Sequence, residues 1–389
     1  MIPPSLQFLF LFIVSIQIST RVSTYALLVS PTTLKLPASM SDDRLFSSLR
    51  DKVIVFIGDS VTRYQYLNLA VAIERKRWPN AYDDDEELPG SVCVQPKYKD
   101  FNEFFLYTSN ALNGNEMCDC WRTKNYNYEN RRYFNPGLNV SLVFIFLGRT
   151  MPQLRQDFKE YPFKRICDFS AKTSYTHSNR SHPTYQQTSS QLLSTGDLQK
   201  CSGKVLQAAH PDAVLPDHGA VLYNVTTMFQ PDIAIINWGH HSPFEIIYKS
   251  GKWVYETMTR ALATLNMEMN NRTRFVWKTT TPACHHDKAN RVMGQCSLTS
   301  DTDSTPPVKV GNLLVYNHFM EMFNAHDLVT TLDHNIKYMK RRHPIEGEAA
   351  NNLTFEHAMP LFVDDIHLHC WVNTELNKAL LTQLFFQMK

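Results

Sequence analysis

Two hydrophobic patterns alternate along the 389-residue chain. Short apolar runs rich in β-branched residues predict strands, and these fall at 52–57, 140–147, 233–237, 274–278 and 328–332. Longer stretches with apolar residues at helical spacing predict helices directly after Ser60 and at 253–269, 313–325 and 374–388. Strands that alternate with helices usually pair in parallel under helices on both faces. The sequence therefore predicts an α/β fold, a three-layer α/β/α sandwich with a mainly parallel sheet.

The amino-terminal region has a different pattern from the rest. Leu6–Ile18 is an uncharged, largely apolar run. It is shorter than the roughly 20 residues that span a bilayer, but it suits the core of a signal peptide. We expect a signal peptide or short signal anchor at 1–26, a polar stem at 27–43 and a single domain at 44–389. Within that domain, a segment around 173–195 rich in Ser and Thr predicts a long surface insertion.

Five Asn-x-Ser/Thr sequons support entry into the secretory pathway. The glycosylation candidates are Asn139, Asn179, Asn224, Asn271 and Asn352. Together with the leader they predict a lumenal or extracellular body, with the amino-terminal segment as the only possible membrane tether.

The eight cysteines fit the same compartment, because thiols exposed to an oxidising environment tend to form disulfides. Their connectivity stays open. Cys118-Asp119-Cys120 and the His-rich segments at 284–287 and 367–370 are alternative metal sites, but none has the paired Cys-x-x-Cys spacing of structural zinc. We expect disulfides and no metal.

Charge and glycine usage exclude other classes. The chain has 39 Lys and Arg against 37 Asp and Glu, a net charge of +2, which gives no broad basic surface for nucleic acid. Its 13 glycines include no Gly-x-Gly and no phosphate-binding loop, so a nucleotide is not expected. We expect no cofactor.

One cluster of polar residues follows the first predicted strand as Gly58-Asp59-Ser60. A serine at a sharp strand-to-helix turn exposes its hydroxyl, and the backbone N–H groups of the helix start face any anion that forms there. Ser60 is thus a candidate nucleophile. The alternative is a helix start in which Asp59 or Ser60 only caps the first turn.

A second cluster, Asp364-x-x-His367, precedes the last predicted helix. A serine needs an imidazole to remove its proton, and the imidazole needs a carboxylate to orient it. His367 and Asp364 fit these two roles, while His369 with Asp365 is a rival pair. A purely structural histidine is the remaining alternative.

The two clusters together resemble the SGNH/GDSL hydrolase superfamily, and more closely its PC-esterase branch, the trichome-birefringence-like glycan O-acetyltransferases. The resemblance is colinear from about Arg44 to the carboxyl end. It rests on five blocks: Leu49–Arg63, Asn139–Ser141 with the strand that ends near Arg149, Asn237–His241, Trp277–Pro282 and Asp364–His367.

The resemblance implies an acyl-serine mechanism that moves an acetyl group onto or off a carbohydrate hydroxyl in the Golgi lumen or outside the cell. Ser60 would be the nucleophile, His367 the general base and Asp364 its orienting carboxylate. The oxyanion or substrate would be held near the Ser60 amide by residues of the first three blocks: Gly58, Asp59, Arg149, Asn237 and Gly239. The alternative, purely structural roles are that Asn237 only closes a buried turn and that Arg149 belongs to a surface ion pair.

The chain departs from the family pattern in three ways. It lacks the cysteine-rich amino-terminal subdomain, His241 stands where tryptophan is usual, and Cys370 comes one residue late. The partners expected are a glycan acceptor or acylated substrate and an acyl donor of unknown kind. Alternatives are a secreted esterase, a non-catalytic glycan-binding protein of the same fold, and a metalloenzyme built on the His clusters. A disulfide at Cys370 would help hold His367 in place.

Overall fold

The computed structural model describes the chain at 41–79, 104–105, 107–108, 111–122, 127–147, 218–237, 252–269, 272–282, 284–285, 297–298, 306–332 and 367–387. The chain divides into two units, Met1–Ser39 and Met40–Lys389, and all described residues lie in the second. The leader at 1–26, most of the stem and the insertion around 173–195 lie outside the described residues. Among the helices that are described, none has the length and apolarity needed to span a membrane.

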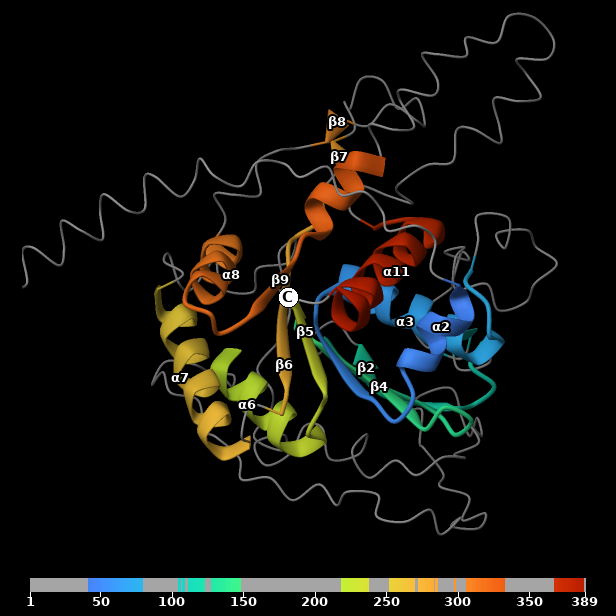
Figure 1. Cartoon of the computed structure of the whole chain (residues 1–389), viewed down its shortest axis with the longest axis horizontal. Coiled ribbons are helices and arrows are strands. Elements are labelled where there is room, and N and C mark those ends of the chain that lie inside the picture. Colours follow the sequence, from blue (N-terminus) through green and yellow to red (C-terminus); the bar gives the residue numbers. More distant parts are fainter. Residues whose placement is uncertain are drawn as a thin grey trace, which may run out of the picture. The chain divides into compact units, whose positions relative to one another are not determined.

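Seven strands form the main sheet, in the order β2-β3-β4-β1-β5-β6-β9 (Figure 1). Their bounds are Val53–Gly58 (β1), Glu116–Arg122 (β2), Asn127–Asn135 (β3), Val140–Phe146 (β4), Ile233–Asn237 (β5), Arg274–Lys278 (β6) and Glu321–Phe323 (β9). The pairs from β4 to β9 are parallel, whereas β2–β3 and β3–β4 are antiparallel. The sheet is therefore mixed, and the expectation of a mainly parallel sheet holds for only part of it. Two short strands, Cys284–His285 (β7) and Ser297–Leu298 (β8), pair separately.

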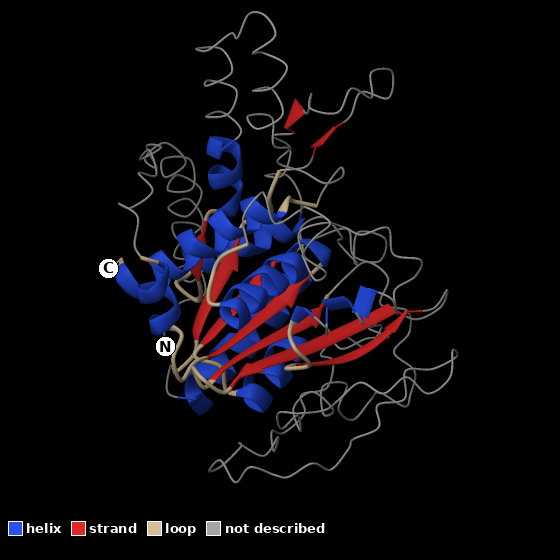
Figure 2. Cartoon of the chain, turned by 90° about the vertical axis from the view of Figure 1, so that its right-hand side faces the viewer, coloured by secondary structure: helices blue, strands red, loops and turns tan. Residues whose placement is uncertain are grey.

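Side chains of β1 alternate between two hydrophobic clusters, because successive residues of a strand point to opposite faces. Ile54 and Phe56 belong to one cluster, and Val55 and Ile57 to the other. The first cluster includes residues of helices Asp42–Ser48 (α2), Ser60–Arg75 (α3) and Cys370–Phe386 (α11). The second includes residues of His218–Phe229 (α6), Lys252–Met269 (α7) and Pro306–Tyr316 (α8). Figure 2 shows the strands twisting relative to one another among these helices.

The predicted strands at the centre of the sheet match the structure closely. β5 and β6 have the predicted bounds, β1 begins and ends one residue later than predicted, and β4 ends one residue earlier. Helices α3, α7 and α11 are also present, although α11 begins at Cys370 rather than Thr374. These runs are apolar enough for the sequence to indicate them without knowledge of their partners.

The prediction for 313–332 is wrong in two places. The helix ends at Tyr316, and the strand placed at 328–332 is helical, since residues 325–332 form one helix. Ala325, Leu328 and Val329 are buried at helical spacing, and this period outweighs the β-branched residues between them. The edge strand is instead the three-residue β9.

Two antiparallel strands, β2 and β3, were not predicted. Their inward-facing residues include the buried charged side chains Glu116, Glu129 and Arg131, which hide the apolar alternation that marks a strand. Helix α6 was also missed, because nearly all of its residues are buried and no polar face reveals its period.

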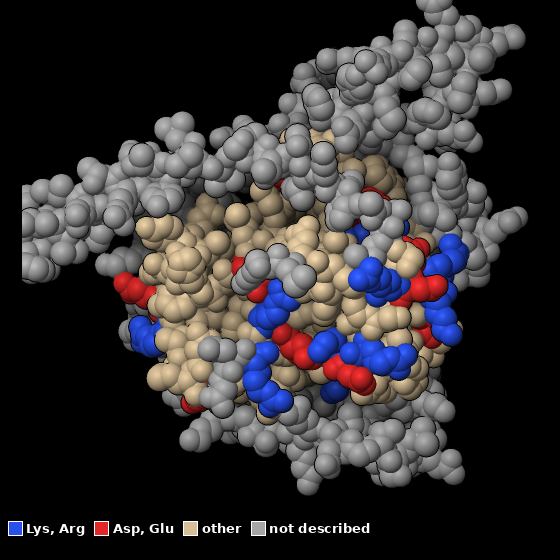
Figure 3. All heavy atoms as spheres, in the orientation of Figure 1, with Lys and Arg blue, Asp and Glu red and all other residues tan. Residues whose placement is uncertain are grey.

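The outer surface carries charges of both signs. On the face shown in Figure 3, Lys and Arg side chains lie beside Asp and Glu side chains. Positive and negative charge are interspersed on this face.

Candidate active site

The site forms where β1 gives way to α3 at the carboxyl edge of the parallel strands. β1 ends at Gly58 and α3 begins at Ser60. A Cβ atom on Gly58 would overlap the backbone oxygen of Asn237 and the hydroxyl of Thr62. Only glycine lets β1, β5 and the first turn of α3 approach one another this closely.

Asp59 caps the amino terminus of α3. Its carboxylate accepts hydrogen bonds from the backbone N–H groups of Val61 and Thr62, at 3.1 and 3.4 Å. The Asp59 side chain is fully buried. Because Asp59 performs the capping, the hydroxyl of Ser60 is available for another contact.

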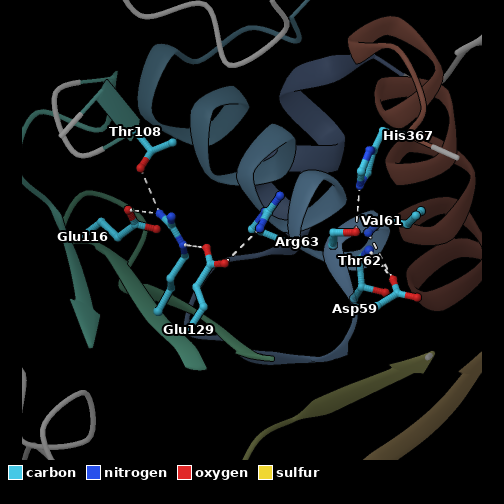
Figure 4. A network of polar contacts seen from close by, with 10 residues as sticks. Asp59, Val61, Thr62, Arg63, Thr108, Glu116, Glu129 and His367 are labelled. Atoms are coloured by element: carbon cyan, nitrogen blue, oxygen red, sulfur yellow. Dashed lines mark hydrogen bonds and ion pairs between the residues drawn. The ribbon is translucent and has the colours of Figure 1, made fainter. Parts of the chain in front are cut away.

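The Ser60 hydroxyl faces an imidazole from the other end of the chain. His367 Nε2 lies 2.7 Å from Ser60 Oγ, across 307 residues of sequence (Figure 4). Ser60 retains only 9% of its exposure and His367 is half-buried. The structure thus brings together two of the predicted site residues, and it pairs His367 rather than His369 with the serine. His369 instead occupies the N-cap position of α11.

A buried polar seam between α3 and α11 fixes the distance between these two helix starts. Asn68 Nδ2 donates to the backbone oxygen of Cys370 at 3.2 Å and to Thr374 Oγ1 at 3.1 Å. Asn377 Nδ2 donates to Asn68 Oδ1 and to the backbone oxygen of Gln65, both at 3.0 Å. Buried hydrogen bonds are directional, so this seam sets the register of the two helices as well as their separation.

The ring of Tyr64 packs against the imidazole of His367. The two rings meet edge to face, with centroids 5.2 Å apart. Tyr64 itself lies under the guanidinium of Arg63, 4.6 Å from its ring centroid. Aromatic packing of this kind restricts the orientation of the imidazole.

A buried ion cluster, consisting of Arg63, Glu116, Glu129 and Arg131, lies next to the first turn of α3 (Figure 4). Arg63 Nη1 and Glu129 Oε2 are 2.9 Å apart, as are Arg131 Nη1 and Glu116 Oε2. Arg131 also donates through Nε to Glu129. The two positive and two negative charges balance, which buried ions require. The cluster joins the helix that carries Ser60 to β2 and β3.

Opposing effects determine the pKa values within the cluster. Burial is the largest single effect on Arg63 and lowers its pKa, but attraction to Glu129 and Tyr64 together with the hydrogen bond to Glu129 outweighs it and leaves that pKa raised. Burial raises the pKa of Glu129, yet attraction to Arg63 and Arg131 leaves it below the usual value. For Glu116 burial dominates, and its pKa is raised despite Arg131. Both arginines therefore stay charged, and Glu129 is their firmly ionised partner.

Asn237, predicted as an oxyanion donor, is engaged in another role in the structure. It is buried, and its Nδ2 donates to the backbone oxygen of Lys278 at 2.9 Å and to Thr280 Oγ1 at 3.2 Å. These contacts use both amide hydrogens to join the ends of β5 and β6. The geometry favours the interpretation that Asn237 closes a buried turn. Asp364, Gly239 and Arg149 lie outside the described residues.

Two of the predicted glycosylation sites fall within the described residues. Asn139 is exposed, and its side chain donates to Asp51 Oδ1 at 2.8 Å. Asn224 lies in the middle of α6 with 7% of its surface exposed. An attached glycan has no room there, so the structure corrects the prediction for Asn224. Three further sequon residues lie outside the described part: Asn179, Asn271 and Asn352.

Cys118 and Cys370 are each disulfide-bonded. No two cysteines within the described part of the chain lie at bonding distance. Cys370 is the first residue of α11 and also lies 3.4 Å from Asn68 Nδ2 through its sulfur. In the described ranges no group of three His, Cys, Asp or Glu residues is placed to hold a metal ion.

The sequence did not reveal the residues that support the Ser60–His367 pair. These are the ion cluster, Tyr64 and the buried Lys278 at the end of β6. The one available signal was Lys278 itself, a charged residue that directly follows the apolar residues Phe275, Val276 and Trp277 of a buried strand.

Comparison with known proteins identifies no relative: no family model matches the chain, and no curated protein is significantly similar to it.

Proposed function

We propose that this protein transfers acyl groups through a covalent acyl-Ser60 intermediate, with His367 as general base and Asp364 as the carboxylate that orients it. The single observation that carries the proposal is the 2.7 Å contact between Ser60 Oγ and His367 Nε2 at the start of α3. A serine and a histidine at this distance and at a helix amino terminus form the basic unit of nucleophilic acyl transfer.

The chemistry follows from this pair. Ser60 Oγ attacks the acyl carbonyl carbon while His367 Nε2 accepts the hydroxyl proton. The resulting oxyanion lies near the backbone N–H groups of the first turn of α3, whose dipole favours negative charge. When the intermediate collapses, the bond to the leaving group of the acyl donor breaks and His367 passes the proton to that leaving group. In the second half, an acceptor hydroxyl attacks acyl-Ser60 by the same steps.

The acyl group we propose is acetyl and the acceptor a carbohydrate hydroxyl. This assignment follows the resemblance to the PC-esterase branch. The finer fold we propose is likewise that of an SGNH hydrolase, a three-layer α/β/α sandwich with the parallel strands at its centre. From the leader and the sequons we propose that the protein acts in the secretory pathway, in the Golgi lumen or outside the cell.

Hydrolysis is the second candidate, because water and a sugar hydroxyl compete for the same acyl-enzyme. Ser60 is 9% exposed, and such burial limits access of bulk water to the intermediate. The same burial also restricts a sugar acceptor, so our preference for transfer over hydrolysis rests on the resemblance.

The test is incubation with acetylated and unacetylated glycans and candidate acetyl donors, with mass spectrometry to measure both acetate release and acetyl transfer. Ser60→Ala should lower the rate by at least about 10³-fold. Ser48→Ala is a matched control, because Ser48 donates only to the backbone of α2. Full activity in Ser60→Ala would contradict the mechanism.

A serine-directed fluorophosphonate separates the enzyme from a binding protein of the same fold. The enzyme should form an adduct on Ser60, and the adduct should be absent in Ser60→Ala and in His367→Ala. A folded wild-type protein that binds glycans and forms no adduct would favour the binding protein. Elemental analysis that finds stoichiometric metal would favour the metalloenzyme.

A further inference from the structure

A lysine is buried beneath the proposed nucleophile. Lys278 is the last residue of β6 and has no exposed surface. Val276 lies two residues before Lys278 on the same strand, and Phe323 is paired with Lys278 on β9. Both belong to the hydrophobic cluster that also contains residues of α3. On this face its Nζ donates to Gln65 Oε1 of α3 at 3.0 Å. The lysine thus reaches from the sheet to the helix that begins at Ser60.

The charge of Lys278 has no direct ion-pair partner within the described part of the chain. The charged group that acts on it is Asp59. Burial lowers the pKa of Lys278 to about 8, and attraction to Asp59 opposes this effect. Asp59 is itself fully buried and bound to the first backbone N–H groups of α3. Two buried groups of opposite charge that act on each other are therefore attached to the first two turns of α3, Asp59 through its cap and Lys278 through Gln65.

The strand register explains why these two residues come together. Gly58 of β1 pairs with Asn237 of β5, and the side chain of Asn237 is bonded to the backbone of Lys278. Asp59 directly follows Gly58. The carboxyl ends of the parallel strands β1, β5 and β6 lie at one edge of the sheet, so the lysine and the capping carboxylate are both close to that edge.

We propose that Lys278 is a positioning residue, the buried cation that holds the Asp59 carboxylate against the first turn of α3 and so fixes the orientation of Ser60 toward His367. This inference rests on the proposed function of Ser60. Attraction between charges is strong where water is excluded, and a carboxylate held in this way gives a firmer helix cap than a neutral side chain.

Stability alone does not account for a lysine at this place. A charge removed from water is costly when it lacks a close partner. Methionine has a similar length and shape and would fill the same space among apolar residues without that cost. Lys278→Met also leaves the buried Gln65 Oε1 without its donor, and this loss offsets the gain from removing the charge. The free energy of unfolding should therefore stay close to that of the wild type, while the reactivity of Ser60 falls.

The test is a double-mutant cycle of Lys278→Met and Asp59→Asn, read out by the second-order rate constant for fluorophosphonate labelling of Ser60 and by urea unfolding. Each single variant should slow labelling by about tenfold. In the double variant the second change should cost less than about twofold, because both changes remove one interaction. Lys378→Met is the control for loss of a lysine, since Lys378 lies on α11 and pairs with Asp42 at 3.7 Å.

Three results would overturn the inference. They are wild-type labelling of Lys278→Met, additive effects in the double variant, and a large loss of stability in Lys278→Met, which would show a purely structural role. Failure of the proposed function looks different, because the wild-type protein itself would then not be labelled on Ser60.

Discussion

Gly58, Asp59 and Ser60 each meet a different requirement at the end of β1. Gly58 permits close contact with β5, Asp59 satisfies the free N–H groups of α3, and Ser60 turns its hydroxyl to His367. The sequence left open whether the triplet caps a helix or supplies a nucleophile. In the structure capping belongs to Asp59, which leaves the Ser60 hydroxyl for the proposed chemistry.

Gly58→Ala should destabilise the protein. The new methyl group would meet the backbone oxygen of Asn237, which cannot rotate away. Overpacking of this kind should cost about 3 kcal/mol in the free energy of unfolding, measured by urea denaturation. Gly137→Ala is the control, because the atom nearest to its Cβ is a side-chain oxygen 3.3 Å away. Equal stability of the two variants would contradict the tight contact at Gly58.

Only part of the site could be predicted from the sequence. Ser60 and His367 each lie in a short local motif, so their roles were visible before their contact was. Arg63 and Lys278 also lie in blocks that carry the resemblance, but no role could be given to them, because Glu129 and Asp59, the charged groups that act on them, are far away in the sequence or of ambiguous role. The role of a buried charged side chain depends on the oppositely charged group near it, and tertiary structure determines which residue supplies that group.

At the scale of elements, the site depends on how α3 and α11 are joined. Each helix begins beside one member of the Ser60–His367 pair, and the polar seam at Asn68 fixes their relative position. A shift of one helix along the other would move the imidazole away from the hydroxyl. Distances of this kind control rate strongly, because proton transfer needs hydrogen-bond contact.

Asn68→Ala should therefore lower both stability and activity. It leaves several buried groups without partners, which should cost about 2 to 3 kcal/mol in the free energy of unfolding. In the protein that remains folded, the labelling rate of Ser60 should fall as well. Asn317→Ala is the matched control, because Asn317 is exposed and its side chain donates a single hydrogen bond, to Tyr255. A fully reactive, stable Asn68→Ala would show that the seam is dispensable.

The ion cluster connects α3 to β2 and β3, and Glu129 is the carboxylate shared by both arginines. Glu129→Gln leaves excess positive charge in a buried place, so it should cost roughly 3 kcal/mol of stability. Glu321→Gln, in a half-exposed pair with Arg274, should cost less than about 1 kcal/mol. Urea denaturation of both variants measures the difference. Similar losses would mean that burial does not govern these pairs.

The elements that were predicted wrongly share a physical cause. In 328–332, β-branched residues suggested a strand, although Ala325, Leu328 and Val329 are buried at helical spacing. In β2 and β3, ion pairing lets charged residues occupy the inner face and removes the expected alternation. Local propensity was overridden by tertiary contacts in both cases.

At the scale of the whole molecule, the five parallel strands position the site and the two antiparallel strands extend the sheet at one edge. β1 lies near the middle of the sheet and pairs with both β4 and β5. The proposed nucleophile therefore follows a strand that is hydrogen-bonded on both sides. The α/β class could be predicted because buried central strands are apolar throughout. The mixed topology could not be predicted, since the sequence of β2 or β3 alone does not reveal the direction in which that strand pairs with its neighbour.

The central claim is that Ser60 carries the acyl group during turnover. The most direct measurement is rapid acid quenching during reaction with an acyl donor, followed by mass spectrometry of the peptide that contains Ser60. The wild type should show one acyl group on Ser60 that disappears when acceptor is added, and Ser60→Ala should show none. Turnover at the normal rate with an unmodified Ser60 peptide, or in Ser60→Ala, would contradict the account.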